Sequence, residues 1–397
     1  MTSRERVQTV YGFGVPDRVP YFELTVNHPV ASKILGRDAT CGFGGYVRGK
    51  VQNTLMTQGR RDEWVERFTT DSLAVAKVLG FDILLMQWMP AKGDKWDLKE
   101  VEPNTWKWEG KDGSYGVSRW DPGTDFYGEV ESSFGRDPEG ELRRWIADLK
   151  REPRARISEG SLDYAVRARQ EFPGHFLWGG AGLGIPYSED GLMSLIEYPG
   201  LWREYAELQV EHDKPSIDAQ VAAGADAFWD GSDWAYKTRP LVSPATYREI
   251  FLEPMRELVR YLHTRGMKFI KHTDGNIEVF EEMWFGEIGM DGYHAIEPSA
   301  GMDILRLRKS WPKLLLHGNL DCGSLLTLGT KAQIEDEVVR LARGLAPHSG
   351  WVFSSSNSIH SGVPVGNLLA MIESIKKHGK CEMRNAECEM TEKEKGR

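Results

Sequence analysis

Eight short apolar segments, most of them followed by a segment with helical periodicity, constrain most strongly how this 397-residue chain folds. Between them, apolar residues recur at three-to-four spacing, as over residues 62–79, and such spacing predicts helices. Alternation of eight strands with helices favours an α/β fold of the (β/α)8 TIM barrel type. A doubly wound open sheet is the alternative, but no Gly-x-Gly-x-x-Gly follows the first strand, so a dinucleotide site is unsupported. The predicted strands are residues 19–24, 81–86, 176–181, 227–230, 268–273, 292–297, 314–319 and 351–356.

Residues 87–135, after the second predicted strand, differ in composition from the rest of the chain. Nine aromatic residues stand there among Gly, Asp and Lys, and residues 106–117 alternate around an Asp-Gly turn, which predicts a β-hairpin. We interpret the block as an insertion in a single domain of residues 1–378. It is either a hairpin packed over the scaffold or an aromatic wall over a pocket. Residues 379–397 are charged and aperiodic, and predict a disordered tail.

The overall composition excludes several classes of function. A net charge of −9 argues against nucleic acid or an anionic membrane surface as the main partner. The four cysteines form no Cys-x-x-Cys pair, which favours reduced thiols. The first residues lack an apolar signal core, and no stretch approaches the roughly 20 apolar residues of a membrane span. We therefore expect a cytoplasmic protein.

Polar side chains follow the apolar strands at the points where the strands end. In a barrel these strand ends meet at one mouth, where active sites lie. A polar ring at the mouth of an apolar barrel is expected of a catalytic site and not of a purely structural barrel. The ring comprises Glu23, Asp82 with Gln87, residues 180–187, Asp230 with Asp233, His272 with Asp274, Glu297, Asn319 with Cys322, and residues 354–360.

Three successive strand ends offer metal ligands, namely His272, Glu297 and Cys322. Zinc accepts nitrogen, sulfur and oxygen ligands, and a catalytic zinc site keeps one position open. A carboxylate such as Glu297 in a barrel mouth is costly unless it is paired or bound to metal. Other interpretations stay open. His272 is equally a histidine bonded to a carboxylate, Cys322 a small buried hydrophobe, and Asp274 either a fourth candidate ligand or a helix cap.

Other polar and aromatic residues near the strand ends are candidates for catalysis or substrate binding. Asp230 and Asp233, next to Trp234, bind substrate, orient a proton or simply stabilise their loop. Asp82 adjoins a buried strand and needs a partner inside the protein. We assign possible substrate contacts to four residues, which are Trp88, Asp233, Trp234 and Asn319.

The ordered set of strand-end motifs resembles the uroporphyrinogen decarboxylase superfamily, whose fold is the same barrel. The resemblance runs from residue 17 to about residue 379, and no single motif decides it. It implies that Tyr187 and His360 line the pocket. The motifs are Asp17-Arg18-Val19-Pro20, Leu79-Gly80-Phe81-Asp82, Leu241-Val242-Ser243-Pro244, His272-Thr273-Asp274-Gly275, Glu297-Pro298-Ser299-Ala300-Gly301-Met302-Asp303, His317-Gly318-Asn319-Leu320-Asp321-Cys322 and Ile359-His360-Ser361-Gly362-Val363-Pro364.

The superfamily has two chemistries, and the resemblance distinguishes them. Its decarboxylases use two arginines and an aspartate, without metal; Asp82 matches the aspartate, but residues 23–28 contain no arginine. Its cobalamin-dependent methyltransferases hold zinc with a His-x-Cys motif and a distant cysteine. His272 and Cys322 match those positions, while Asp274 replaces the middle cysteine. The implied ligands are His272, Cys322 and either Glu297 or Asp274.

The resemblance therefore predicts a zinc-dependent methyltransferase. It would move a methyl group between a small methylated substrate, or a small acceptor, and a corrinoid (cobalamin) carried by a partner protein. The aromatic insertion suggests a methoxylated aromatic substrate and hence an O-demethylase. One alternative is a metal-free decarboxylase acting through Asp82, Tyr187 and His360; another is a non-catalytic barrel that binds a corrinoid protein. A homodimer is considered as the assembly.

Overall fold

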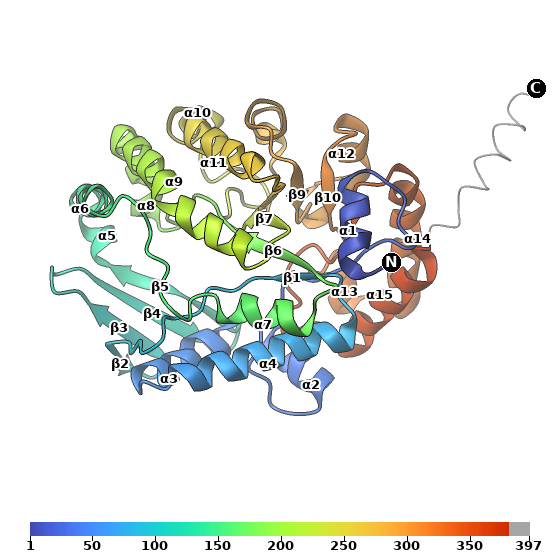
Figure 1. Cartoon of the computed structure of the whole chain (residues 1–397), viewed down its shortest axis with the longest axis horizontal. Coiled ribbons are helices and arrows are strands. Elements are labelled where there is room, and N and C mark those ends of the chain that lie inside the picture. The colour runs from blue at the N-terminus through green and yellow to red at the C-terminus, as the bar shows by residue number, and fades with distance from the viewer. Residues whose placement is uncertain (381–397) are drawn as a thin grey trace, which may run out of the picture.

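The computed structural model describes residues 1–380, and the rest of the predicted tail, residues 381–397, lies outside the described residues. Seven parallel strands form one curved sheet in the order β1-β6-β7-β8-β9-β10-β11 (Figure 1). Their order follows the chain, as expected of successive β/α units. The strands are β1 (Ile83–Leu85), β6 (Phe176–Gly180), β7 (Ala227–Asp230), β8 (Phe269–His272), β9 (Gly292–His294), β10 (Leu315–His317) and β11 (Trp351–Val352).

The first predicted strand, residues 19–24, connects the two edges of this sheet without forming a continuous ladder. Phe22 N–H donates to the Phe353 carbonyl at 3.1 Å, and Phe353 N–H donates to the Pro20 carbonyl at 2.9 Å. On the other side, Asp82 N–H donates to the Tyr21 carbonyl at 2.8 Å. Pro20 has no N–H to give, which shortens the ladder at this point. The fold is therefore TIM-barrel-like, with seven regular strands and an eighth segment held by single bridges.

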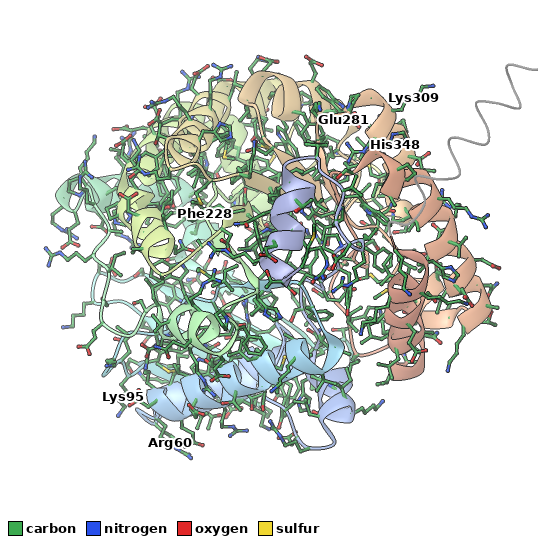
Figure 2. All side chains as sticks on the ribbon, turned by 45° about the vertical axis from the view of Figure 1, so that its right-hand side comes forward. Arg60, Lys95, Phe228, Glu281, Lys309 and His348 are labelled. Atoms are coloured by element: carbon green, nitrogen blue, oxygen red, sulfur yellow. The ribbon has the colours of Figure 1, made fainter. Side chains whose placement is uncertain are left out.

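Helices surround the sheet and lie in the connections between its strands, with α15 after the last strand (Figure 1). Gly80, at a positive φ of 76°, ends the long helix α4, and a capping box of Thr330 and Gln333 begins α14. Charged side chains such as Arg60, Lys95 and Lys309 lie at the periphery, whereas Phe228 is fully buried (Figure 2). The principal outer helices are α4 (Arg61–Leu79), α7 (Asp163–Glu171), α8 (Glu189–Glu197), α9 (Pro199–Ala222), α10 (Pro244–Ile250), α11 (Leu252–Thr264), α12 (Ile304–Ser310), α14 (Lys331–Leu345) and α15 (Val365–His378).

Further helices lie in the connections between these elements. None of the helices in residues 1–380 is both long and apolar enough to cross a membrane. The helices in the connections are α2 (His28–Leu35), α3 (Asn53–Thr57), α5 (Ser133–Arg136), α6 (Pro138–Arg151), α13 (Leu325–Leu328), the π-helices η1 (Tyr46–Gln52) and η3 (Glu282–Ile288), and the 3-10 helices η2 (Glu278–Phe280), η4 (Pro298–Ala300) and η5 (Ala346–His348).

Helix α1 (Ser3–Tyr11) covers the end of the barrel where the strands begin. Its Val7, Val10 and Tyr11 pack into the apolar cluster inside the barrel. Trp178 Nε1–H donates to the Tyr11 hydroxyl at 2.8 Å, and that hydroxyl lies 3.0 Å from His317 Nε2. This end of the barrel is thus filled by packed side chains, and the opposite mouth is left for a site.

The aromatic insertion forms a four-stranded antiparallel sheet where the sequence predicted one hairpin. Its strands are β2 (Leu98–Glu102), β3 (Thr105–Glu109), β4 (Tyr115–Asp121) and β5 (Phe126–Ser132). The outer strands β2 and β5 are rich in charged and exposed residues, so their periodicity is weak in the sequence. The insertion contacts η1 and α3: Tyr46 N–H of η1 donates to Asp125, in the turn between β4 and β5, at 2.8 Å, and Asn53 Nδ2 of α3 donates to the Tyr127 hydroxyl at 3.0 Å.

Candidate metal and substrate site

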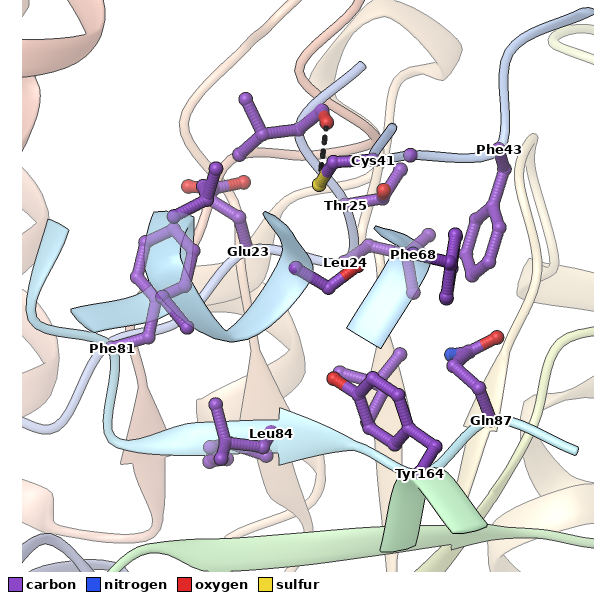
Figure 3. A pocket seen from close by; sticks show the side chains of 17 residues that line it. Glu23, Leu24, Thr25, Cys41, Phe43, Phe68, Phe81, Leu84, Gln87 and Tyr164 are labelled. Carbon is purple, nitrogen blue, oxygen red and sulfur yellow. Dashed lines mark hydrogen bonds between the residues drawn. The ribbon is translucent and has the colours of Figure 1, made fainter. Parts of the chain in front are cut away.

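A cavity of about 600 Å³ opens where the strands end. Its floor is formed by residues that follow β1, β6 and β7, together with His272 at the end of β8. Phe43, Arg48 and Trp88 line it from the connecting segments. A second cavity of about 60 Å³ shares Leu24, Phe43 and Gln87 with it and is also lined by Glu23 and Cys41 (Figure 3).

Asp233, His272 and Asp274 bring ligand atoms within 4.8 Å of one another. His272 Nε2 lies 3.9 Å from Asp233 Oδ1 and 3.8 Å from Asp274 Oδ1. Two ligands of one zinc ion, with bonds of about 2.0–2.2 Å, are at most about 4 Å apart. These two separations therefore suit a single divalent ion among the three side chains.

A chain of hydrogen bonds orients His272 as a ligand. The Ser354 hydroxyl donates to the Ser355 carbonyl at 2.8 Å, so its oxygen is left to accept from His294 Nε2–H at 3.3 Å. His294 Nδ1 then accepts from His272 Nδ1–H at 2.7 Å. This assignment leaves the lone pair of His272 Nε2 facing the two carboxylates. An outer hydrogen bond of this kind fixes the tautomer of metal-binding histidines.

The imidazole of His272 is neutral over the whole physiological range. Burial, together with the neighbouring Lys271 charge, lowers the pKa of His272 to about 3. Burial also lowers the pKa of His294 well below its usual value. A neutral imidazole is the form that binds a metal.

The two carboxylates are also oriented by outer contacts. Asn357 Nδ2 donates to Asp274 Oδ2 at 2.7 Å, while Asp274 Oδ1 is buried and has no hydrogen-bond partner within residues 1–380. Asp274 N–H donates to Asp233 Oδ1 at 2.9 Å, and Asp233 N–H donates to the Tyr187 hydroxyl at 2.8 Å. Burial and the nearby Asp233 raise the pKa of Asp274 to about 7. A buried oxygen without a partner next to a second carboxylate is an environment that a cation would stabilise, so the donor set fits a divalent metal.

The other two predicted ligands lie outside this group. Glu297 accepts from Gly275 N–H at 3.0 Å and from the Ser299 hydroxyl, so it supports the loop that carries Asp274. Cys322 is buried, receives the Ser356 hydroxyl at 3.7 Å, and burial raises the pKa of its thiol to about 12. The structure thus groups His272 and Asp274 with Asp233, which the sequence placed among the substrate contacts.

Asp82 and Asp230, which were predicted to be catalytic, both form buried ion pairs. Asp82 precedes β1, at the end of the barrel opposite the cavity, and binds Arg6 and Arg18, each at 2.7 Å. Asp230 lines the cavity, but one of its oxygens accepts from Lys271 Nζ at 2.8 Å and the other from the Ser232 hydroxyl at 2.7 Å. The partner that Asp82 needs is therefore a pair of arginines, which gives this carboxylate a structural role.

Tyr187 and His360 differ in how many of their polar atoms take part in hydrogen bonds. The Tyr187 hydroxyl accepts the Asp233 N–H, and its own proton stays free beside the candidate metal site. Both ring nitrogens of His360 are engaged: Nδ1 accepts from Gly362 N–H at 3.1 Å, and Nε2 lies 3.4 Å from the Cys322 carbonyl. Tyr187 thus positions the loop that carries Asp233, and His360 stabilises the loop in which it lies itself.

The other predicted substrate contacts lie in different environments. Trp88 is 43% exposed and lines the cavity. Trp234 is fully buried and packs edge-on against Tyr247 and Phe251, so it belongs to the core and not to the cavity wall. Asn319 is buried and donates to the Ile296 carbonyl at 2.9 Å.

Three residues with clear roles around the cavity were not singled out from the sequence. They are His294, which orients His272, Lys271, which pairs with Asp230, and Arg48. His294 lies within the predicted strand of residues 292–297 and ends the observed strand β9, so a second histidine in the neighbouring predicted strand was the available signal. Arg48 lies in a Gly-rich segment whose π-helix has no recognisable sequence pattern.

Residues 187–378 match the family model described as "Uroporphyrinogen decarboxylase (URO-D)". The resemblance to the uroporphyrinogen decarboxylase superfamily is confirmed. The matched residues include Asp233, His272 and Asp274, while Arg48 and the aromatic insertion lie outside them. The superfamily match thus covers the part of the barrel that carries the candidate ligands.

Curated uroporphyrinogen decarboxylases and a solved structure are also similar to parts or all of this chain. Uroporphyrinogen decarboxylase of Coxiella burnetii is 26% identical over 164 residues, and that of Geobacter metallireducens is 25% identical over 166 residues. These alignments cover 40% and 41% of this chain and only 42% and 45% of the relatives. A methyltransferase from Methanosarcina mazei is similar in structure, with a TM-score of 0.63 and 16% identity over 95% of this chain and 99% of that one. At this identity, the similarity shows the shared fold.

Proposed function

We propose that this member of the superfamily is a zinc-dependent methyltransferase that moves a methyl group from a small methoxylated aromatic compound to a corrinoid on a partner protein. The observation that carries the proposal is the arrangement of His272, with its Nε2 lone pair facing Asp233 and Asp274 at the barrel mouth. A fold shared with the Methanosarcina mazei methyltransferase is compatible with it.

The three side chains would hold zinc through one nitrogen and two carboxylate groups. When bound, zinc supplies a Lewis acid for an ether oxygen, and a corrinoid supplies the acceptor for the methyl group. In the transfer the carbon–oxygen bond breaks, the bonding electron pair stays on the oxygen, and the phenolate takes a proton to leave as a phenol. The protein's own part is to orient the ether and to keep the reacting atoms away from bulk water.

Side chains around the cavity suit this task. Trp88 and Phe43 offer apolar surface to an aromatic ring, and Trp229 packs 5.8 Å from the His272 ring, centroid to centroid. The buried Lys271 and Asp230 neutralise each other, so this pair brings no net charge to the cavity. An aromatic ether would thus lie between apolar walls with its oxygen toward His272.

Metal analysis of the purified protein tests the first half of the proposal. We expect about one zinc per chain after reconstitution, and loss of that zinc in His272→Ala and Asp274→Ala, because each removes a ligand. His263→Ala is the matched control, since His263 also bonds a carboxylate, Asp291 at 2.7 Å, but is not in the cluster. A wild-type protein that binds no divalent metal under these conditions would overturn the zinc site.

Methyl transfer to free cob(I)alamin tests the second half. We expect a panel of methoxybenzenes to methylate cob(I)alamin in the presence of the zinc-loaded protein and not of His272→Ala. A panel of other methyl donors, such as methanol, methylamines and methyl thioethers, defines the class. If no donor methylates cob(I)alamin while zinc is bound, the site serves another reaction.

The location of Asp82 disfavours the metal-free decarboxylase. That alternative uses Asp82 with Tyr187 and His360, but Asp82 lies at the closed end of the barrel and is bonded to two arginines. A non-catalytic barrel that binds a corrinoid protein predicts binding of that partner without turnover, and the cob(I)alamin assay separates it from the enzyme.

A further inference from the structure

Arg48 in η1 is an exposed arginine that lines the barrel-mouth cavity, and its guanidinium has no polar partner within the described residues. Within residues 1–380 it forms neither an ion pair nor a side-chain hydrogen bond, and its one close contact is the Phe43 ring, 4.4 Å from the guanidinium carbon. By contrast, Arg61 bonds Asp163 and the Pro90 carbonyl, both at 2.8 Å, and Arg308 bonds two carbonyls at 2.9 Å.

Arg48 is one of the residues that line the barrel-mouth cavity. The side chain stays exposed to that space, yet the surrounding protein desolvates it and lowers the pKa of the guanidinium. Keeping a cation in a partly desolvated place without a counter-ion costs free energy. An anionic ligand entering the cavity would remove that cost.

The geometry leaves the binding edge of Arg48 available. The guanidinium carbon lies over the Phe43 ring, 4.4 Å from its centroid, and a guanidinium that stacks on an aromatic ring keeps its N–H groups pointing outward in its own plane. A carboxylate meets such an edge through two parallel hydrogen bonds. Lysine could not replace this fork, because its charge is a single point.

Arg48 is connected to the candidate metal site by one continuous lining. Arg48 and His272 both line the cavity of about 600 Å³. A second cavity of about 420 Å³ shares Arg48, Gln87 and Trp88 with the first and adds Trp64, Trp96 and Tyr127. An aromatic ring between these walls could thus present one substituent to Arg48 and another to His272.

We propose that Arg48 binds a carboxylate of the substrate, so that the methyl donor is a methoxylated aromatic acid held with its carboxylate at Arg48 and its methoxy group toward His272. This assignment rests on the proposed function for the reaction at His272, but not for the binding of the anion. It also implies that cationic methyl donors are excluded, because an unpaired guanidinium repels a methylammonium group.

Binding to the zinc-loaded protein, measured by calorimetry, tests the assignment without turnover. The ligands are the three methoxybenzoate isomers, neutral anisole and the cation benzyltrimethylammonium. We expect Arg48→Gln to weaken the best methoxybenzoate by roughly 10–100-fold, the range for a hydrogen bond to a charged group. Anisole should change by less than about twofold, and the cation should bind more tightly to the variant than to the wild type.

Two further variants keep the result interpretable. Lys50→Gln removes the same charge from the same helix at an exposed residue that lines neither cavity, and should leave all affinities unchanged. Arg48→Lys should restore part of the methoxybenzoate affinity. Arg48→Gln removes no polar contact, so its melting temperature should stay near that of the wild type.

The outcomes separate this inference from the proposed function. Equal loss for methoxybenzoate and anisole, or no methoxybenzoate binding by the wild type at millimolar concentration, overturns the role of Arg48. Arg48-dependent binding without methyl transfer to cob(I)alamin supports the anion site and overturns the methyltransferase proposal alone.

Discussion

At the scale of single residues, the candidate ligand His272 depends on a neighbour that contacts no substrate. His294→Ala removes the acceptor for His272 Nδ1–H, and we expect zinc affinity to fall by roughly 10–100-fold, as for outer-shell partners of metal ligands. His294→Asn, whose side-chain oxygen can take the place of Nδ1, should restore part of it. Competition with a chromophoric chelator measures the affinities. Equal affinity in wild type and His294→Ala would contradict this positioning role.

Glu23 lines the small cavity in Figure 3, and we expect it to make the stability of the protein depend on pH. Burial raises the pKa of Glu23 to about 8, against an ordinary value of 4.5, while Ser355 N–H donates to it at 3.0 Å. The folded state therefore holds this proton more tightly than the unfolded state. Its stabilising contribution is complete below pH 4.5 and is lost as the pH rises through about 8.

Glu23→Gln should remove this dependence, because its amide stays neutral and can donate to the Ser355 hydroxyl. At one pKa unit per about 1.4 kcal/mol, the variant should be a few kcal/mol more stable than the wild type at pH 9 and nearly equal to it at pH 4. Urea unfolding at both pH values measures the difference. A constant difference across this range would show that Glu23 does not titrate as described.

At the scale of secondary-structure elements, the Asp82 ion pairs fasten three segments at the closed end of the barrel. Asp82 before β1 binds Arg6 of α1 and Arg18, which directly precedes the first predicted strand, and its own side chain is fully buried. Asp82→Asn would leave Arg18 without its counter-charge and Arg6 with Asp17 alone, and breaking a buried pair costs roughly 3–5 kcal/mol. We expect lower thermal stability with unchanged zinc content per folded molecule.

The Asp82→Asn variant also tests the decarboxylase alternative. If Asp82 were catalytic, the variant would lose activity at temperatures where it is fully folded. Circular dichroism identifies that range, and the activity measurement is made within it. Normal activity there supports the structural role that the two ion pairs indicate.

At the scale of the whole molecule, the strand and helix pattern was predictable because it depends on local periodicity, whereas the site depends on contacts between distant segments. All seven strands of the barrel sheet lie within predicted segments. The remaining predicted strand, residues 19–24, forms only isolated bridges, because Pro20 has no N–H to donate. The pairing of Asp274 with Asp233 was not predictable, because it requires the turn after β8 to meet the loop after β7. The position of Arg48 also depends on contacts between distant segments, because Asp125 and Tyr127 of the insertion bond Tyr46 and Asn53 on either side of it.

The two ends of the barrel divide stability and chemistry between them, and this division gives a prediction for the molecule as a whole. Val10, fully buried under the closed end, contributes packing alone, so Val10→Ala should cost roughly 1–3 kcal/mol with or without zinc. The crowded carboxylates of Asp233 and Asp274 instead lower the stability of the metal-free protein. Zinc should therefore raise the melting temperature of the wild type and of Val10→Ala by equal amounts, since a ligand that binds only the folded state stabilises it by mass action and distant sites add.

Asp274→Asn provides the contrasting case in the same experiment. It removes the repulsion from Asp233 but retains an oxygen that can accept from Asn357, so we expect the metal-free variant to melt at or above the wild-type temperature, with little further rise on adding zinc. Differential scanning calorimetry of the three proteins, each with and without zinc, measures all six values. A zinc-dependent rise in Asp274→Asn equal to that of the wild type would place the metal elsewhere, because no site built on the Asp274 carboxylate could keep its full affinity after that charge is removed.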